Sequence, residues 1–287
     1  MEKHIENILV PVDFKEPSLV ALSQSFVLAQ HQNIGITLLY VYEEAGLWNQ
    51  VFAEDESSII NDTVIRNLKK ISAEAAEKSG VPVHYLVERG VVHTQIVEVA
   101  KKIKARFIVM SRSNFQDSQS NVLGSDTSRV LRAAPCPVIT INKDEYDPKY
   151  RSIMLPLDLG KQTKHKVTKA IEIAQYFNSS VRVMMAVMDD NPKEMSDFTK
   201  RIEEVKKQFA AQNIKCFVDL VKPTAKERLR ADVIMRYARK QGDVDLIILM
   251  TQQEKNWRDF FMGSTASEVL RNSEYPVLTI LPKSEDK

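Results

Sequence analysis

Apolar and polar residues follow two distinct patterns along the chain. Short runs rich in β-branched residues are typical of strands, and in the first half they cover residues 8–12, 36–41, 83–87, 107–110 and 138–141. Longer segments with apolar residues at helical spacing lie between these runs, at residues 17–33, 56–79, 93–104 and 125–134. The first half of the chain is therefore predicted to alternate strand and helix.

The second half repeats this order, with strands predicted near residues 152–157, 180–187, 215–221, 245–250 and 276–281. Strands separated by helices of this length are joined by right-handed crossovers, which give a parallel sheet covered by helices on both faces. We therefore predict an α/β protein with two doubly wound domains, each built on a five-stranded parallel sheet.

An internal repeat supports this division into two domains. Residues 8–13 (ILVPVD) correspond to 153–158 (IMLPLD), and residues 122–141 align without gaps to 261–280 with ten identities in twenty positions. A repeat half the chain long indicates duplicated domains, and we place them at residues 1–145 and 150–287 on either side of a polar linker.

The closing strand of each half is predicted to lie at the edge of a parallel sheet. Residues 138–141 and 277–280 would each leave unpaired backbone groups along that edge. We therefore expect the two halves to form an intramolecular pseudo-dimer. The sequence leaves open whether two whole chains form a homodimer.

Composition narrows the classes of partner. The 287 residues suit two ordinary domains, and 40 basic against 38 acidic residues leave a formal charge of +2. Such a balance gives no reason to expect a nucleic-acid or membrane partner. Cys136 and Cys216 lie far apart, which excludes a disulfide framework and favours a reducing compartment. With no long apolar run and no signal-peptide pattern, we expect a soluble cytoplasmic protein.

The loops after the first strand of each half are candidate ligand contacts, because ligands of open parallel sheets sit beyond the carboxyl ends of the strands. Pro11, Val12 and Asp13 end the first strand, and Asp158 follows the equivalent strand in the second half. A carboxylate here could accept hydrogen bonds from a ribose hydroxyl or an adenine amino group. Asp13 could equally cap the next helix or form its turn, and the sequence leaves both roles open.

A Gly-Ser pair opens the predicted helix that follows the fourth strand in each half, at Gly124-Ser125 and Gly263-Ser264. A helix N-terminus preceded by glycine offers backbone N–H groups and a favourable dipole to a phosphate, and the serine could add a hydroxyl donor. The alternative is an ordinary helix start. Recurrence in both halves favours the binding role.

These segments carry a family resemblance. ILVPVD, RGVVHTQIVEVAKKIKARFIVM and GSDTSRVLRAAPCPVITI together resemble a universal stress protein domain, and IMLPLD with GSTASEVLRNSEYPVLTI resembles a second one. The resemblance implies an adenine-nucleotide-binding-like α/β fold in which the last strands of two domains pair across a pseudo-two-fold axis. Members of the family divide into those that bind ATP and those that do not.

Carried over by position, the resemblance implies a nucleotide site in each half. In the first half its residues would be Pro11, Val12, Asp13, Val41, Met110, Ser111, Asn114, Gly124, Ser125, Asp126 and Thr127. In the second half they would be Asp158, Gly263, Ser264 and Thr265. The implied ligand is ATP or another adenine nucleotide.

The first half keeps the spacing of the ATP-binding members but not their glycines. Those members have Gly, two residues, Gly, nine residues, and then Gly with Ser or Thr. Ser111 and Asn114 stand where the first two glycines would be, and Gly124-Ser125 completes the series. The replaced glycines would let the backbone approach phosphates, so we expect nucleotide binding here to be weak.

The second half departs further. Its series, Thr251, Glu254 and Gly263, is one residue too short. A carboxylate about 4 Å from a phosphate charge costs about 4 kcal/mol at an effective dielectric of 20. We therefore expect no ATP site in the second half.

The sequence lacks the common motifs of catalytic and metal-binding sites. The chain has no P-loop, no G-x-G-x-x-G turn, no G-x-S-x-G elbow and no metal-ligand spacing among its histidines, so we predict no catalytic residue and no metal site. His93, at a predicted strand-to-helix turn on the ligand edge, is the one histidine that could matter. Cys136, between two prolines, is expected to be a buried, inert thiol.

The function favoured by the sequence is a non-catalytic stress-response binding or regulatory protein with degenerate nucleotide sites, acting on an unknown protein client or small ligand. One alternative is an ATP-binding protein with weak binding or slow hydrolysis at the first site. Another is an interaction scaffold whose pockets are filled by its own side chains. Residues 43–58 could form a lid or partner contact, or simply pack the start of a helix.

Overall fold

The computed structural model describes residues 7–43, 53–112, 123–142, 149–158, 163–187, 192–250 and 264–281. The chain divides into two compact units, residues 1–144 and 145–287, and each is described here by itself. All ten predicted strands are present in these residues, and each begins and ends within two residues of its predicted limits.

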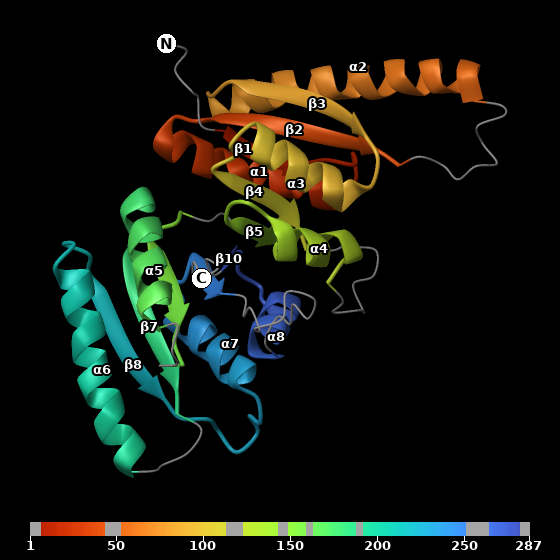
Figure 1. Ribbon diagram of the computed structural model, residues 1–287. Coiled ribbons are helices and arrows are strands. Elements are labelled where there is room, and N and C mark those ends of the chain that lie inside the picture. The colour runs from red at the N-terminus through yellow and green to blue at the C-terminus, as the bar shows by residue number, and fades with distance from the viewer. Residues whose placement is uncertain are drawn as a thin grey trace, which may run out of the picture. The chain divides into compact units, whose positions relative to one another are not determined.

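Unit 1 alternates strands and helices as its sequence pattern predicts (Figure 1). Its elements are β1 (Asn7–Pro11), α1 (Glu16–Gln32), β2 (Gly35–Tyr42), α2 (Ala53–Ser79), β3 (Val83–Arg89), α3 (Val92–Lys102), β4 (Phe107–Ser111), α4 (Ser125–Ala133) and β5 (Val138–Ile141). The strand order is β3-β2-β1-β4-β5, and neighbouring strands are parallel.

Unit 2 repeats this plan. Its elements are β6 (Ser152–Pro156), α5 (Thr163–Phe177), β7 (Ser180–Ala186), α6 (Pro192–Ala210), β8 (Cys216–Val221), α7 (Arg230–Gln241), β9 (Leu246–Met250), α8 (Ser264–Asn272) and β10 (Val277–Ile280). The order within the unit is β8-β7-β6-β9-β10, again with parallel neighbours. Both units therefore have the predicted doubly wound, five-stranded parallel sheet.

The strand order fixes which helices share a face of each sheet. The chain moves outward from β1 to β3, then returns to β4 and β5, so right-handed crossovers place α1 and α2 on one face and α3 and α4 on the other. Contacts agree: α1 packs on α2 and α3 packs on α4, while in unit 2 α7 packs on α8 (Figure 1). The strand order reverses between β1 and β4, and between β6 and β9, where ligands of such sheets bind.

The central strands carry the core. Ile8, Leu9 and Val10 on β1 are fully buried, as are Ile153 and Met154 on β6. Continuous apolar runs fit strands that helices cover on both faces. None of the helices in the described part of the chain is both long and apolar enough to cross a membrane.

Candidate functional site

Asp13 forms the turn that leads from β1 into α1. Its carboxylate accepts a hydrogen bond from the Lys15 backbone N–H at 3.1 Å, and the Lys15 ammonium lies 3.7 Å from the other oxygen. The Asp13 N–H in turn donates to the Ser18 hydroxyl at 3.2 Å. Phe14, between Asp13 and Lys15, has a positive φ of 63°, a backbone conformation that residues other than glycine seldom adopt. Of the two roles that the sequence leaves open for Asp13, the structure displays the turn-forming one.

The other predicted residues near this turn line the same edge of the sheet. Val12 is buried and donates its N–H to the Leu39 carbonyl at 2.8 Å. Met110 is buried near the end of β4, whereas Pro11 and Val41 are partly exposed at the ends of their strands. The topology thus brings the β1, β2 and β4 residues of the predicted first site to one edge.

Protein groups already engage two donor groups of the predicted unit 1 site. The Gly124 N–H donates to the Arg112 carbonyl at 3.0 Å, and the Thr127 hydroxyl donates to the Ser111 carbonyl at 3.1 Å. Helix α4 begins at Ser125 with Gly124 as its N-cap, as predicted. Asn114 lies outside the described residues, so its predicted role stays a prediction.

A carboxylate occupies the first turn of α4. Asp126 Oδ1 lies 3.2 Å from His93 Nδ1, which belongs to the first turn of α3. A negative side chain interacts favourably with the positive end of a helix dipole, as a bound anion would. Asp126 thus places a negative charge of the protein at the helix start where a phosphate is predicted.

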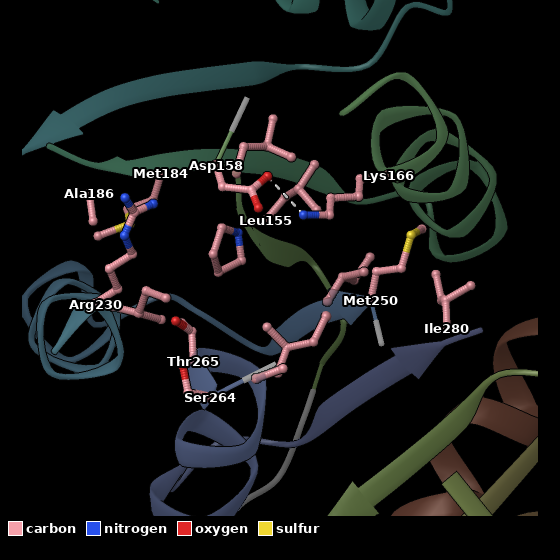
Figure 2. Close-up of a pocket in the computed structure, with 16 residues that line it drawn as sticks. Leu155, Asp158, Lys166, Met184, Ala186, Arg230, Met250, Ser264, Thr265 and Ile280 are labelled. Atoms are coloured by element: carbon pink, nitrogen blue, oxygen red, sulfur yellow. Dashed lines mark hydrogen bonds and ion pairs between the residues drawn. The ribbon is translucent and has the colours of Figure 1, made fainter. Parts of the chain in front are cut away.

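Unit 2 has a pocket at the equivalent edge of its sheet, with a volume of about 320 Å³ (Figure 2). Its floor and walls are the apolar ends of β6, β7, β9 and β10, with Leu155, Met184, Met250 and Ile280 among the lining residues. The pocket therefore opens where the strand order of unit 2 reverses, as expected for a doubly wound sheet.

Polar groups enter this unit 2 pocket from three helices. Asp158, just after β6, pairs with Lys166 of α5 at 2.9 Å, and the lysine side chain is only 14% exposed. Ser264 and Thr265 line the pocket from the first turn of α8. Arg230, the first residue of α7, lies beside Met184 and Ala186 and has no carboxylate partner among the described residues (Figure 2).

The internal repeat aligns Asp126 of unit 1 with Thr265 of unit 2. At the first turn of the closing helix, unit 1 therefore has an acid and unit 2 a neutral hydroxyl. Asp158, Ser264 and Thr265, which the sequence predicts as site residues, all line the unit 2 pocket. Gly263, Thr251 and Glu254 lie outside the described residues.

The comparisons agree with this architecture. The model of the universal stress protein family matches twice, at residues 4–142 and 149–280. The chain belongs to the universal stress protein family. As two consecutive domains of that family, it has the tandem organisation that the repeat predicts.

Among the similar proteins, the first described below supports the family and the second supports the fold of this universal stress protein. A universal stress protein of Methanocaldococcus jannaschii is 30% identical over 145 residues, which cover 50% of this chain and 85% of the relative. The crystal structure of a universal stress protein from Archaeoglobus fulgidus covers 98% of this chain and 99% of its own, with a TM-score of 0.77 and 17% identity. A universal stress protein solved in complex with cAMP is 17% identical over 48% of this chain and 97% of its own, with a TM-score of 0.38.

Sequence reasoning missed Lys166 and Arg230, which line the unit 2 pocket of this universal stress protein. A signal for Arg230 exists in the spacing between elements. Residues 90–91 join β3 to α3, whereas residues 222–229 join β8 to α7, so the connection before Arg230 is longer in unit 2. Lys166 leaves no such signal, because its pairing with Asp158 depends on how α5 packs.

Two observations on the described residues bear on catalysis. Among them, no three His, Cys, Asp or Glu side chains gather as metal ligands would. Burial raises the pKa of Cys136 to about 12, which keeps the thiol protonated and unreactive at neutral pH. The unit 2 pocket offers a cavity, the cation Arg230 and the hydroxyl groups of Ser264 and Thr265.

Proposed function

We propose that this universal stress protein is a non-catalytic binding or regulatory protein whose small-molecule ligand occupies the unit 2 pocket, and that its unit 1 nucleotide site is degenerate. The observation that carries the proposal is the contrast between the two sheet edges. In unit 2 a cavity of about 320 Å³ is lined by Arg230, Lys166 and the first turn of α8. In unit 1 the corresponding helix start is occupied by Asp126.

The charges in the unit 2 pocket favour an anionic ligand. Lys166 and Asp158 compensate one another, which leaves the positive charge of Arg230. The N–H groups at the start of α8 and the hydroxyl groups of Ser264 and Thr265 are suited to a phosphate. The apolar walls are suited to the flat face of a base.

The size of the pocket favours a small nucleotide. Pockets for small molecules range from about 300 to 1,000 Å³, so a volume of about 320 Å³ is near the lower end. We propose an adenine mononucleotide such as AMP, because members of this family bind adenine nucleotides, as in the cAMP complex of a relative.

Unit 1 is proposed to bind nucleotide weakly or not at all. A phosphate about 4 Å from the Asp126 carboxylate would lose about 4 kcal/mol at an effective dielectric of 20. This is half of the roughly 8 kcal/mol that a micromolar affinity represents. The Gly124 N–H and the Thr127 hydroxyl would in addition have to leave their present acceptors.

Weak ATP binding or slow hydrolysis in unit 1 is the second candidate. The preserved spacing from Ser111 to Gly124-Ser125 favours it. Catalysed hydrolysis of ATP would need a general base beside the attacking water. Asp126, the acid in the first turn of α4, is paired with His93. We therefore favour the non-catalytic function.

Calorimetric titration of the full chain with AMP tests the proposal. Thr265→Asp gives unit 2 the acid of unit 1 and should weaken AMP binding at least tenfold, about 1.4 kcal/mol. Asp126→Thr is the matched exchange in unit 1 and should leave that affinity unchanged. Equal binding by Thr265→Asp and the original chain, or a loss with Asp126→Thr, would contradict a site in unit 2.

A further inference from the structure

The connection between β8 and α7 is specific to unit 2. It spans residues 222–229 (KPTAKERL), whereas residues 90–91 suffice in unit 1. This segment, called the 222–229 loop below, ends directly before Arg230. The first residue of the corresponding helix in unit 1 is Val92, so unit 1 has neither the loop nor the arginine.

An ion pair fixes the 222–229 loop. Arg236 of α7 donates through Nε to Glu227 Oε1 at 2.6 Å and through Nη2 to the Lys222 carbonyl at 2.8 Å. The other Glu227 oxygen accepts the Thr224 N–H at 2.7 Å. The Glu227 side chain is only 10% exposed, and its hydrogen bond from Arg236 lowers the pKa of the carboxyl. Arg236 thus holds the loop both at its first residue, Lys222, and at Glu227.

The end of the loop is held as well. The Leu229 N–H donates to Asp232 Oδ2 at 3.3 Å, while the Asp232 N–H donates to the Leu229 carbonyl at 3.1 Å. These bonds fix the residue at which α7 begins, and Arg230 follows as its first helical residue. The backbone that carries Arg230 is therefore fixed, and its side chain lines the pocket beside Met184 and Ala186 (Figure 2).

Helix α7 packs against α8, so Arg230 and Thr265 line the same pocket from neighbouring helix starts. The equivalent helix starts of unit 1 lie close enough for His93 and Asp126 to pair at 3.2 Å. In unit 1 the anion at this place is the protein's own carboxylate. Unit 2 has Thr265 instead and adds the cation Arg230, which nothing in the described chain neutralises.

We propose that Arg230 is a specificity-determining residue of the unit 2 pocket, and that it selects a ligand ending in an open phosphomonoester. This inference rests on the proposed function, since it assumes that the pocket binds a nucleotide. A guanidinium can donate two parallel hydrogen bonds to two oxygens of one phosphate. A phosphomonoester has three terminal oxygens and a charge near −2 at neutral pH. A cyclic phosphodiester carries a single charge, and a nucleoside carries none.

The test compares two exposed arginines near the start of α7, of which Arg230 lines the pocket and Arg228 lies in the 222–229 loop. Arg230→Gln removes the charge that lines the pocket, and Arg228→Gln removes an exposed charge two residues away that does not line it. The full-length variants are titrated with AMP, cyclic AMP and adenosine by calorimetry. Thermal unfolding of each variant checks that it is folded, and Arg230→Lys retains the charge without the two-pronged geometry.

We expect the original chain to bind AMP more tightly than cyclic AMP, and cyclic AMP more tightly than adenosine. Arg230→Gln should weaken AMP binding by about tenfold to a hundredfold, as expected for hydrogen bonds to a charged group. It should change the affinity for adenosine by no more than about twofold, which is too small a change to reflect a lost charged contact. Arg230→Lys should fall between, and Arg228→Gln should resemble the original chain.

Three results would overturn the proposal. If AMP binds and Arg230→Gln does not weaken it, Arg230 is not the selecting residue, although the proposed function survives. If Arg228→Gln weakens AMP binding as much as Arg230→Gln does, the loss reflects the overall positive charge of this region and not a contact from Arg230. If the original chain binds none of the three probes, the proposed function itself fails, and the inference fails with it.

Discussion

His93 Nδ1 and Asp126 Oδ1 lie 3.2 Å apart and join the first turns of α3 and α4. This pair stands at the edge of unit 1 where the family resemblance predicts a phosphate. In unit 2 the position of Asp126 is taken by Thr265, which lines a pocket. The replacement of Asp126 by Thr265, together with the added Arg230, thus distinguishes the edge of unit 2 from that of unit 1.

Exchanging Asp126 for threonine should cost little stability. The His93 and Asp126 side chains are 24% and 38% exposed, so solvent screens their interaction. Loss of the pair and of the acid in the first turn of α4 should lower the free energy of unfolding by no more than about 1 kcal/mol. Urea denaturation measures this change, and a loss above about 2 kcal/mol would show that the pair is a buried structural link instead.

The Glu227–Arg236 pair should give unit 2 a pH-dependent part of its stability. The Arg236 hydrogen bond lowers the pKa of Glu227 in the folded state, so the contribution is present above the unfolded pKa of about 4.3. It is lost as the pH falls from there through the folded pKa, because the carboxylate is then protonated. At pH 7, Glu227→Gln should cost about 1 to 3 kcal/mol.

Glu203→Gln is the matched control for this change. Glu203 pairs with Lys206 at 3.3 Å on α6, and both side chains are about half exposed. Its loss should cost less than about 0.5 kcal/mol at any pH. Denaturant unfolding at pH 7 and at pH 3 compares the variants, and a cost of Glu227→Gln that persists undiminished at pH 3 would contradict the assignment.

Both thiols should react slowly at pH 8. Burial raises the pKa of Cys136 to about 12 and that of Cys216 to about 11. Thiolate fractions of about 1 in 10,000 and 1 in 1,000 follow, and the thiolate is the reactive form. Reaction with a disulfide reagent should be far slower than that of a free thiol of pKa about 8.5, until denaturant is added. A rapid reaction of one thiol in the folded protein would contradict the pKa shift of that cysteine.

The expected pseudo-dimer can be tested by cutting the linker. A protease recognition sequence replacing residues 145–148 allows the folded chain to be cleaved between its units. If the halves associate as expected, the cleaved protein should elute from a sizing column at the position of the intact chain. Separation into two half-sized species would contradict the pseudo-dimer.

Much of the fold could be predicted because it depends on local patterns. The buried runs of β1 and β6 have fully apolar stretches such as Ile8–Val10, and the repeat fixes the same order of elements in both units. Strands covered on both faces leave few alternative assignments. The first turns of α4 and α8 could likewise be placed from their Gly-Ser pairs.

The chemistry of the site was harder to predict, because it depends on contacts between distant residues. Asp158 is identified by its place after β6, but its partner Lys166 is positioned by the packing of α5. Arg230 lines the pocket directly after a loop that the Glu227–Arg236 pair holds, and no sequence motif indicates that pair. Sequence reasoning accordingly favoured unit 1 for a nucleotide, whereas the geometry leads us to propose unit 2.

Hydrogen–deuterium exchange of the full chain with and without AMP tests the location of the ligand most directly. Bound ligand slows exchange of the amides it covers or orders. We predict protection in peptides that contain residues 155–158, 184–187, 230–234 and 264–266 of unit 2, and no change around residues 11–13 and 124–127. Protection confined to the unit 1 peptides would contradict the account.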